Sequence, residues 1–397
     1  MKPMLALEEA QERAFSLVSP MESETIPVEE AQNRHLAGDL LARRTQPQAN
    51  LSAMDGYAIG SADECKGPWK MIGESRAGTP FDGVLGRGET VRISTGAHVP
   101  AGADRILIQE NVEANGQDIT CTHDFPVEGR HIRMAGFDFA AGDLVLPAGT
   151  AMGSAQIALA ITAGHADVTV AKCPTVAVLD SGDELAADPS TCGPHQIPAS
   201  NGAMIAALVR SLGCKTIRLG PVPDDLEALA EALAKAEGAD FLVTTGGASV
   251  GDHDLMQPAL EQWGANLDFW KVTMKPGKPV MVGKRGDQVI FGLPGNPVSS
   301  YVTAFLFVLP ALRKAMNAAA PLPRMSLIPA GEIFPSAGSR REFLRGIWDG
   351  QSVIRTDSQD SSALKALAAA NCLVHRPAHA TEVAAGEPVP VFLLENG

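Results

Sequence analysis

The chain has 397 residues, of which 45% are hydrophobic and 20% are charged. This length exceeds what one ordinary hydrophobic core organises, so about two to four domains are expected. The composition is that of a folded globular protein rather than a disordered or fibrous one. The formal net charge of −14 argues against a nucleic-acid partner, because phosphate backbones are bound by dense patches of Lys and Arg. An anionic ligand would need locally concentrated cations and backbone N–H groups.

The sequence favours a cytoplasmic protein without a membrane partner. Its longest apolar run, Tyr301–Leu312, contains Pro310 and falls short of the roughly 20 residues that cross a bilayer, so a buried helix is predicted there. Glu8, Glu9 and Glu12 stand where a secretory signal needs an unbroken apolar segment. The six cysteines form no Cys-x-x-Cys pair, which argues against a zinc knuckle, a redox dithiol or a disulfide framework.

Apolar periodicity divides the first half of the chain into two units. Three- and four-residue spacing predicts helices over Leu5–Leu17, Val28–Leu41 and Ala155–Ala163. Residues 1–45 and 140–172 are therefore assigned to one helical domain. Between them, residues 46–139 show short alternating runs with many glycines, which predicts an inserted β-rich domain.

Residues 173–322 alternate strands with helices, the pattern of a parallel-type sheet covered on both faces, that is, a three-layer α/β domain. Asn201 is expected to cap one helix, Asp224 or Asp225 the next, and Pro297 to open a third. An Ala- and Pro-rich linker then leads to a final β-rich unit over residues 323–397. The predicted strands are Val176–Leu179, Thr216–Leu219, Phe241–Thr244, Phe269–Thr273 and Val289–Phe291.

Ligands of such sheets bind outside the carboxyl ends of the strands, so the loops that follow the strands are the candidate site. The loop Thr245–Asp254 is rich in glycine, and its N–H groups, at Gly246 and Gly247 above all, could form a nest for an oxyanion. It is neither a Walker loop nor a dinucleotide fingerprint. A plain turn is the commoner meaning of Gly-Gly, but Ser249 and Asp254 beside it favour function.

Several carboxylates are expected on the same rim, among them Glu184, Asp224 and Asp254. Like charges brought close stay ionised only when a cation bridges them, and oxygen ligands suit Mg²⁺. A helix cap or a solvated loop is the alternative for each, and for Asp225 and Asp252 it is preferred. Lys275 and Lys278, on a loop stiffened by prolines, supply local cations, although a solvated basic turn would look the same.

Two further motifs lie in the β-rich unit. MDGYA at 54–58 contains an Asp-Gly of the kind that makes hairpin turns, and STGA at 94–97 follows a β run. By local reasoning alone, both are closer to structural turns than to catalytic residues.

Taken in order, these segments resemble the molybdopterin molybdenumtransferases, the MoeA and gephyrin E-domain family. The resemblance implies a helical segment interrupted by a β domain, a molybdopterin-binding α/β domain and a C-terminal β-barrel. It also implies a homodimer in which the MDGYA-bearing domain of one subunit contributes to the partner's cleft. The matching segments are MDGYA, STGA, GADRILIQEN at 102–111, SGDEL at 181–185, TTGGASVGDHD at 244–254, KPGKP at 275–279, GLPGNPVS at 292–299, REFLRG at 341–346 and SSALKALAAAN at 361–371.

The family's reaction converts adenylylated molybdopterin and molybdate, with a divalent cation such as Mg²⁺, into molybdenum cofactor and AMP. Carried over by position, the resemblance implies catalytic roles for Asp55, Thr95, Asp138, Glu184, Asp224 and Asp254. Of these, Glu184, Asp224 and Asp254 are expected to hold the Mg²⁺. The substrate-binding positions are Gly246, Gly247, Ser249, Lys275, Lys278, Pro294 and Pro297.

The chain departs from the family's usual pattern at three places. Ser181 replaces a threonine but keeps a hydroxyl, Ala199 replaces an aspartate, and Phe137 replaces a glutamate beside Asp138, which weakens the assignment of Asp138.

Two other functions remain open. A molybdopterin adenylyltransferase shares the GGxSxGxxD loop and the α/β domain but normally lacks flanking domains. A scaffold that binds receptor peptides, like gephyrin's E domain, is the second, although nothing in the sequence marks a peptide groove. Besides a second copy of the chain, molybdopterin adenylyltransferase and molybdoenzyme maturation proteins are candidate partners.

Overall fold

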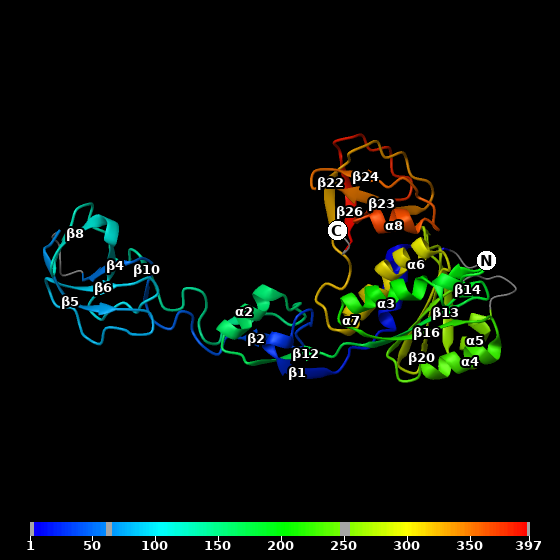
Figure 1. Ribbon diagram of the computed structural model, residues 1–397, viewed down its shortest axis with the longest axis horizontal. Coiled ribbons are helices and arrows are strands. Elements are labelled where there is room, and N and C mark those ends of the chain that lie inside the picture. Colours follow the sequence, from blue (N-terminus) through cyan, green and yellow to red (C-terminus); the bar gives the residue numbers. More distant parts are fainter. Residues whose placement is uncertain (1–3, 61–65, 247–254, 395–397) are drawn as a thin grey trace.

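The computed structural model describes residues 4–60, 66–246 and 255–394. The molecule is elongated (Figure 1), with a β-rich unit at one end and an α/β unit at the other. A small unit that contains α2 lies between them, and the C-terminal unit packs beside the α/β unit. This arrangement agrees with the predicted fold class.

The α/β unit is built on a six-stranded sheet in the order β16-β13-β17-β21-β20-β18. The first four strands are parallel. β20 was not predicted and runs antiparallel to both of its neighbours, so the sheet is mixed rather than wholly parallel. A two-residue turn that contains Gly286, with φ of 59°, joins β20 to β21 as a hairpin. The strands are β13 (Thr175–Ser181), β16 (Lys215–Val222), β17 (Phe241–Thr245), β18 (Asn266–Lys271), β20 (Pro279–Arg285) and β21 (Gln288–Leu293).

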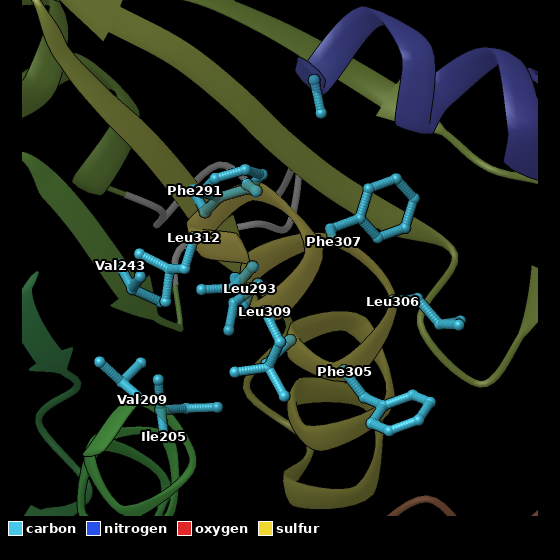
Figure 2. Packing of buried hydrophobic residues seen from close by; sticks show 14 of the residues in the cluster. Ile205, Val209, Val243, Phe291, Leu293, Phe305, Leu306, Phe307, Leu309 and Leu312 are labelled. Atoms are coloured by element: carbon cyan, nitrogen blue, oxygen red, sulfur yellow. The ribbon is translucent and has the colours of Figure 1, made fainter. Parts of the chain in front are cut away.

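Helices cover both faces of this sheet. Val176 and Val178 of β13 face one hydrophobic cluster, and Ala177 and Leu179 face another, because successive side chains on a strand point to opposite sides. Figure 2 shows the first cluster, where α3 and the long C-terminal helix of the unit pack on β17 and β21. That face carries α3 (Asn201–Ser211), α6 (Pro297–Thr303), η4 (Ala304–Val308) and α7 (Leu309–Ala315), and the other face carries α4 (Leu226–Lys235) and α5 (Met256–Gln262).

The predicted buried helix after Pro297 is confirmed. α6, η4 and α7 follow one another without a break, and η4 is a π-helical turn. Pro310 has no N–H to give to the carbonyl oxygen of Leu306, and the buried Gln11 side chain donates to that oxygen at 2.8 Å. No helix within the described ranges is long and apolar enough to cross a membrane.

Gln11 belongs to α1 (Leu7–Ser16), which packs into the α/β core rather than into a separate helical domain. Leu7, Ala10 and Ala14 are buried in the same cluster as α7. The N–H of Leu5 also donates to the carbonyl oxygen of Lys271 at the end of β18. The assignment of all residues 1–45 to the first domain is therefore corrected: its first helix crosses to the α/β unit because its apolar face is buried there.

The helix predicted over Val28–Leu41 is wrong. After β1 (Ser23–Pro27), only η1 (Val28–Glu30) is helical, and Asn33 turns the chain with φ of 63°. The following N–H groups bond to distant segments, with Leu36 donating to the carbonyl oxygen of Thr150 and Ala37 to that of Thr169 in β12 (Asp167–Ala171). Tertiary pairing thus overrides the local apolar spacing. Besides β12, the unit is completed by β2 (Leu40–Leu41), β11 (Leu144–Leu146) and α2 (Ser154–Thr162).

The β-rich unit contains a six-stranded sheet in the order β7-β4-β6-β5-β9-β8. Tyr57, Ile59 and Trp69 are buried on it, and a small β3–β10 pair lies beside it. Its elements are β3 (Leu51–Ser52), β4 (Gly56–Ile59), β5 (Trp69–Ser75), β6 (Glu89–Ile93), β7 (Arg105–Ile108), η2 (Gln109–Asn111), β8 (Val112–Asn115), β9 (Asp118–Cys121) and β10 (Ile132–Arg133).

The C-terminal unit is a barrel that borrows one strand from the α/β unit. Its sheet runs β19-β23-β25-β26-β22, and a bridge between Ala330 and Val353 of β24 closes it. β19 (Met274–Lys275) comes from the α/β unit and pairs in parallel with β23. The other elements are β22 (Met325–Pro329), β23 (Arg341–Trp348), β24 (Val353–Arg355), α8 (Leu364–Ala369), β25 (Cys372–Arg376) and β26 (Pro388–Leu393).

An aromatic cluster fills the joint between these two units. His375 stacks on Phe343 with ring centroids 5.4 Å apart and also contacts Phe392, which packs on Phe305 of η4. Among the described residues, neither ring nitrogen of His375 has a hydrogen-bond partner. Burial, and next the nearby Arg341 cation, lowers the pKa of His375 from its ordinary 6.5 to about 4.

The joint should therefore weaken in acid. Above pH 6.5 His375 is neutral in both the folded and the unfolded chain, so its contribution is fully present. As the pH falls from about 6.5 to 4, His375 becomes protonated in the unfolded chain but stays mostly neutral in the folded chain, so the free energy of unfolding falls. A His375→Phe variant should lose less stability over that range, by about 1 kcal/mol at pH 5. Urea unfolding at pH 7.5 and pH 5, with the exposed His98→Phe as control, measures this. Identical pH dependence in wild type and His375→Phe would contradict it.

Candidate functional site

A cavity of about 1320 Å³ lies where the α/β unit meets the C-terminal barrel. Of the residues predicted for the site, those that line it are Glu184, Gly246, Lys275, Lys278, Pro294 and Pro297. The C-terminal unit adds Arg340, Phe343, Leu344, Arg345, Gln359, Asp360, Ser361, Ser362 and Leu364. Loops far apart in sequence therefore share one cavity, as a ligand site requires.

The α/β side of the cavity is made at the carboxyl ends of the parallel strands. Glu184 follows β13, Gly246 follows β17, and Pro294 and Pro297 follow β21. Gly246 has φ of 88°, and a Cβ there would lie 2.8 Å from the carbonyl oxygen of Ser181. Only glycine therefore lets the β17 loop turn this closely against the β13 loop.

The loop with two lysines forms the wall nearest the barrel. Its first residues are fixed by the β19–β23 pairing, which places Lys275 beside Glu342. The Nζ atom of Lys275 is 3.6 Å from a carboxylate oxygen of Glu342. Gly277, with φ of 93°, lies over α6, where a Cβ would be 2.5 Å from Oγ1 of Thr303. Lys278 lines the same wall.

Sequence reasoning assigned no role to the barrel residues, of which Arg345 is the most unusual. Its side chain is 1% exposed, and it donates to the carbonyl oxygens of Ser358 and Asp360 at 3.3 and 3.1 Å. Gln359 accepts the backbone N–H of Arg345 at 2.9 Å. Arg345 thus fixes the loop that carries Ser361. The only sequence signal for these barrel residues was the resemblance of REFLRG at 341–346 and SSALKALAAAN at 361–371 to the family.

Ser361 joins the two units across the cavity. Its carbonyl oxygen accepts the N–H of Val298 at 3.0 Å, and its hydroxyl accepts from the side-chain amide of Asn296 at 3.2 Å. Both donors lie at the start of α6. The barrel loop is therefore bonded to the N-terminus of an α/β helix, where free N–H groups would otherwise lack partners.

The cavity is a basic region of an acidic chain. Among the described lining residues, four side chains are basic and two are acidic, whereas the whole chain has a net charge of −14. Cations gathered in one concave site attract and orient anions. The basic residues are Lys275, Lys278, Arg340 and Arg345, and the acidic ones are Glu184 and Asp360.

The predicted metal ligands are placed only in part. Glu184 is exposed on the cavity rim. The Asp183 carboxylate beside it accepts the backbone N–H of Asp224 at 3.0 Å, so the two loops touch. Asp225 caps α4, as one of the two predicted alternatives. Asp254 lies outside the described residues, as do Gly247 and Ser249. Within the described ranges no group of three or more His, Cys, Asp or Glu could hold a metal.

The prediction that Asn201 caps α3 is wrong. α3 begins at Asn201, and its preceding residue, Ser200, makes no side-chain cap. The amide of Asn201 instead donates to the carbonyl oxygen of Gly295 at 2.6 Å. It therefore links α3 to the loop after β21 on the cavity side.

Three predicted residues lie far from this cavity within one chain. Asp55 and Thr95 are in the β-rich unit at the opposite end of the molecule (Figure 1). The backbone N–H of Thr95 donates to the Asp55 carboxylate at 2.7 Å. This hydrogen bond lowers the pKa of Asp55. Asp138 is exposed beside the small central unit, where its N–H donates to Gln46. A single protomer therefore brings together the α/β and barrel residues but not these three.

Comparison with known proteins gives one consistent result along the chain. Residues 5–164 match the MoeA N-terminal region (domain I and II), residues 177–314 a probable molybdopterin binding domain, and residues 328–394 the MoeA C-terminal region (domain IV). A molybdopterin molybdenumtransferase of Haemophilus influenzae is 33% identical over 398 residues, which cover 98% of each chain. The chain belongs to the MoeA family.

Other members of the MoeA family support the same assignment. A molybdopterin molybdenumtransferase of Staphylococcus aureus is 32% identical over 99% of this chain and 96% of its own. The crystal structure of a molybdopterin biosynthesis MoeA protein from Pyrococcus horikoshii superposes with a TM-score of 0.84 at 26% identity, covering 98% of this chain and all of the other. The family resemblance and the fold class predicted from the motifs are therefore confirmed.

The basic character of this MoeA-type cavity can be tested with a simple anion. Glu342 partly neutralises Lys275, so Glu342→Gln should strengthen binding of sulfate by about two- to fivefold, the effect of one exposed ion pair. Glu332→Gln breaks a comparable pair with Arg355 elsewhere on the barrel and should leave sulfate binding unchanged. Calorimetric titration at low ionic strength compares the variants. Weaker or unchanged sulfate binding by Glu342→Gln would contradict the assigned role of Lys275.

Proposed function

We propose that this chain is a transferase that inserts molybdenum from molybdate into adenylylated molybdopterin and releases AMP. The observation that carries the proposal is the basic cavity itself. It is formed by the segment that matches a molybdopterin binding domain and is completed by a barrel that matches the MoeA C-terminal region. The relatives named molybdopterin molybdenumtransferase align over nearly the whole chain.

The side chains suit two anionic substrates. Lys275, Lys278 and Arg340 line one cavity and could bind the oxygens of a phosphoanhydride and of molybdate. Such preset charges stabilise the negative charge that develops when AMP leaves. In the balanced reaction adenylylated molybdopterin with two thiol groups and molybdate give the dioxo-molybdenum cofactor, AMP and one water. Of the four molybdate oxygens, two stay on molybdenum, one enters the new P–O bond, and one leaves as water with the two thiol hydrogens. The phosphoanhydride P–O bond breaks, and the dithiolene sulfurs of the substrate, not protein cysteines, become ligands of molybdenum.

The acidic rim suits a hard divalent cation such as Mg²⁺. Glu184 and Asp224 would hold it together with Asp254, which lies outside the described residues, because carboxylate oxygens are the ligands that Mg²⁺ prefers. The contact between the Asp183 and Asp224 loops keeps two of these carboxylates on neighbouring loops. When bound, the cation would offset the charge of the phosphoanhydride.

Replacing one cavity cation should slow the reaction without unfolding the protein. Lys278→Ala should lower turnover about 100-fold, the usual cost of losing one charge-stabilising group. Lys284→Ala removes a lysine from the far end of β20, where it faces Asp287, and should retain full activity. The assay supplies adenylylated molybdopterin, molybdate and Mg²⁺ and follows AMP release together with cofactor formation. Full activity in Lys278→Ala would refute this role.

Two further measurements separate the rival functions. Adenylylation of molybdopterin from ATP, in place of consumption of the adenylate, would indicate the adenylyltransferase. Tight peptide binding with no molybdate-dependent turnover would indicate a scaffold. The matches on both sides of the α/β domain favour the molybdenumtransferase, because the adenylyltransferase normally lacks those domains.

We also propose that the active form is a homodimer whose cleft is shared between subunits. Asp55, Thr95 and Asp138 lie far from the cavity of their own chain, and the apolar side chains of Met134 and Phe137 next to Asp138 are 54% and 75% exposed. Large exposed apolar residues beside candidate catalytic groups suit an interface with another subunit. The proposed setting is the cytoplasm, with molybdopterin adenylyltransferase and molybdoenzyme maturation proteins as transient partners.

Subunit complementation tests the shared cleft. Asp55→Ala and Lys278→Ala homodimers should each be nearly inactive. When the two variants are unfolded and refolded together, the mixture should recover about a quarter of wild-type activity. Half of the dimers then contain one copy of each variant, and each of these dimers has one intact site out of two. Asp55→Ala mixed with Glu184→Gln should recover similarly, whereas Lys278→Ala mixed with Glu184→Gln should not. No recovery in the first two mixtures would refute a cleft shared in this way.

A further inference from the structure

A fully buried carboxylate lies directly behind the cavity. Asp180, near the end of β13, has no exposed surface and lines a side chamber of about 70 Å³ together with Glu184 and Gly246, which also line the main cavity. Burial raises the pKa of the Asp180 carboxyl, and its partners oppose that rise. None of the roles assigned above uses this group.

Three partners from different segments hold the Asp180 carboxylate. The guanidinium of Arg218 on β16 donates to it at 2.8 Å, the hydroxyl of Thr245 at the end of β17 donates to its other oxygen, and the backbone of Gly202 in α3 packs directly against it. A buried carboxylate is tolerated only when it is paired and hydrogen-bonded in this way. Only the Asp180 end of this ion pair is shielded from solvent, since the Asp180 side chain is 1% exposed and the Arg218 side chain is 32% exposed.

The Asp180 carboxylate also lies at the start of α3. Ser200 makes no side-chain cap at the start of this helix, so its first N–H groups need acceptors from elsewhere. A negative charge near a helix N-terminus is stabilising. The contact requires glycine at position 202, because a Cβ there would lie 2.2 Å from Oδ2 of Asp180.

Two of these contacts lead to loops of the cavity. Thr245 precedes Gly246, whose turn rests on the carbonyl oxygen of Ser181. α3 starts with Asn201, which bonds to Gly295 in the loop after β21. The single carboxylate of Asp180 thus connects the loops after β13, β17 and β21.

We propose that Asp180, charge-balanced by Arg218, is a positioning residue that sets the spacing of the phosphate-binding loops around Gly246. The inference rests on the proposed function for the identity of the substrate, but the positioning itself applies to any phosphoanhydride bound at these loops. Asp180 touches no reacting atom and acts through Thr245 and α3.

The test compares Asp180→Asn with Asp240→Asn. Asp240 serves as the control because its carboxylate also binds a backbone N–H, that of Thr175, at 2.8 Å. This contact lies at the amino ends of β13 and β17, away from the cavity. Inorganic pyrophosphate serves as the binding probe in calorimetric titration. Asp180→Asn should weaken pyrophosphate binding about tenfold, the value of one lost buried charge-assisted hydrogen bond. It should raise the KM for adenylylated molybdopterin by a similar factor and change kcat less than about threefold.

A merely structural role would give a different pattern. It would lower the melting temperature and the active fraction, hence kcat, while pyrophosphate affinity and KM stayed at wild-type values, and that result overturns the proposal. If Asp180→Asn does not fold, Thr245→Val removes one of the three contacts, and we expect about threefold weaker pyrophosphate binding; unchanged binding overturns the proposal equally. Should the wild type bind pyrophosphate yet insert no molybdenum, the proposed function fails while the positioning role is still decided by the titrations.

Discussion

The pairing of β19 with β23 is the constraint on which the site depends. Two residues of the α/β unit, Met274 and Lys275, form the edge strand of the C-terminal barrel. The backbone that carries the cavity lysines is therefore part of both units, and the barrel cannot move away without breaking a sheet. Ser361 of the barrel, which is bonded to the start of α6, and the aromatic cluster around His375 hold the same joint. A basic cavity between two domains follows from this joint.

The joint also explains how an acidic chain forms a basic cavity. Neither unit alone presents the full set of solvent-accessible cations, since Lys275 and Lys278 come from the α/β unit and Arg340 from the barrel. Docking the two units concentrates positive charge in one concave region while the rest of the surface stays acidic. Local charge density, not net charge, then determines which ligand the protein binds.

Local patterns identified the parts of the site that are made locally. Glu184 and Gly246 follow buried strands of a parallel sheet, so the rule that ligands bind at carboxyl ends predicted them as site residues, and both line the cavity. The capping role of Asp225 followed from its position before an amphipathic helix. What could not be predicted depends on long-range contacts. The Val28–Leu41 segment pairs with distant strands instead of forming a helix, α1 crosses to the α/β core, and Asn201 bonds to Gly295 instead of capping its helix.

Asp180 illustrates the same limit at the level of one side chain. In sequence it is the first residue of an acidic loop, and a solvated carboxylate would be the ordinary expectation. Among the described carboxylates of the site it is the most buried, because Arg218 and Thr245 donate to it and Gly202 packs against it, from segments that sequence spacing does not relate. Its neighbours Asp183 and Glu184 remain exposed. Position in the chain thus distinguishes these three acids less well than tertiary contacts do.

The central claim is that loops of the α/β unit and of the barrel bind one ligand together. Hydrogen exchange measured by mass spectrometry, with and without saturating adenylylated molybdopterin, tests it most directly, because backbone amides report each loop separately. The account predicts slower exchange on binding in residues 181–185, 275–279, 294–297 and 358–362 alike. Protection confined to the α/β loops, with residues 358–362 unchanged, would contradict a cavity shared by the two units.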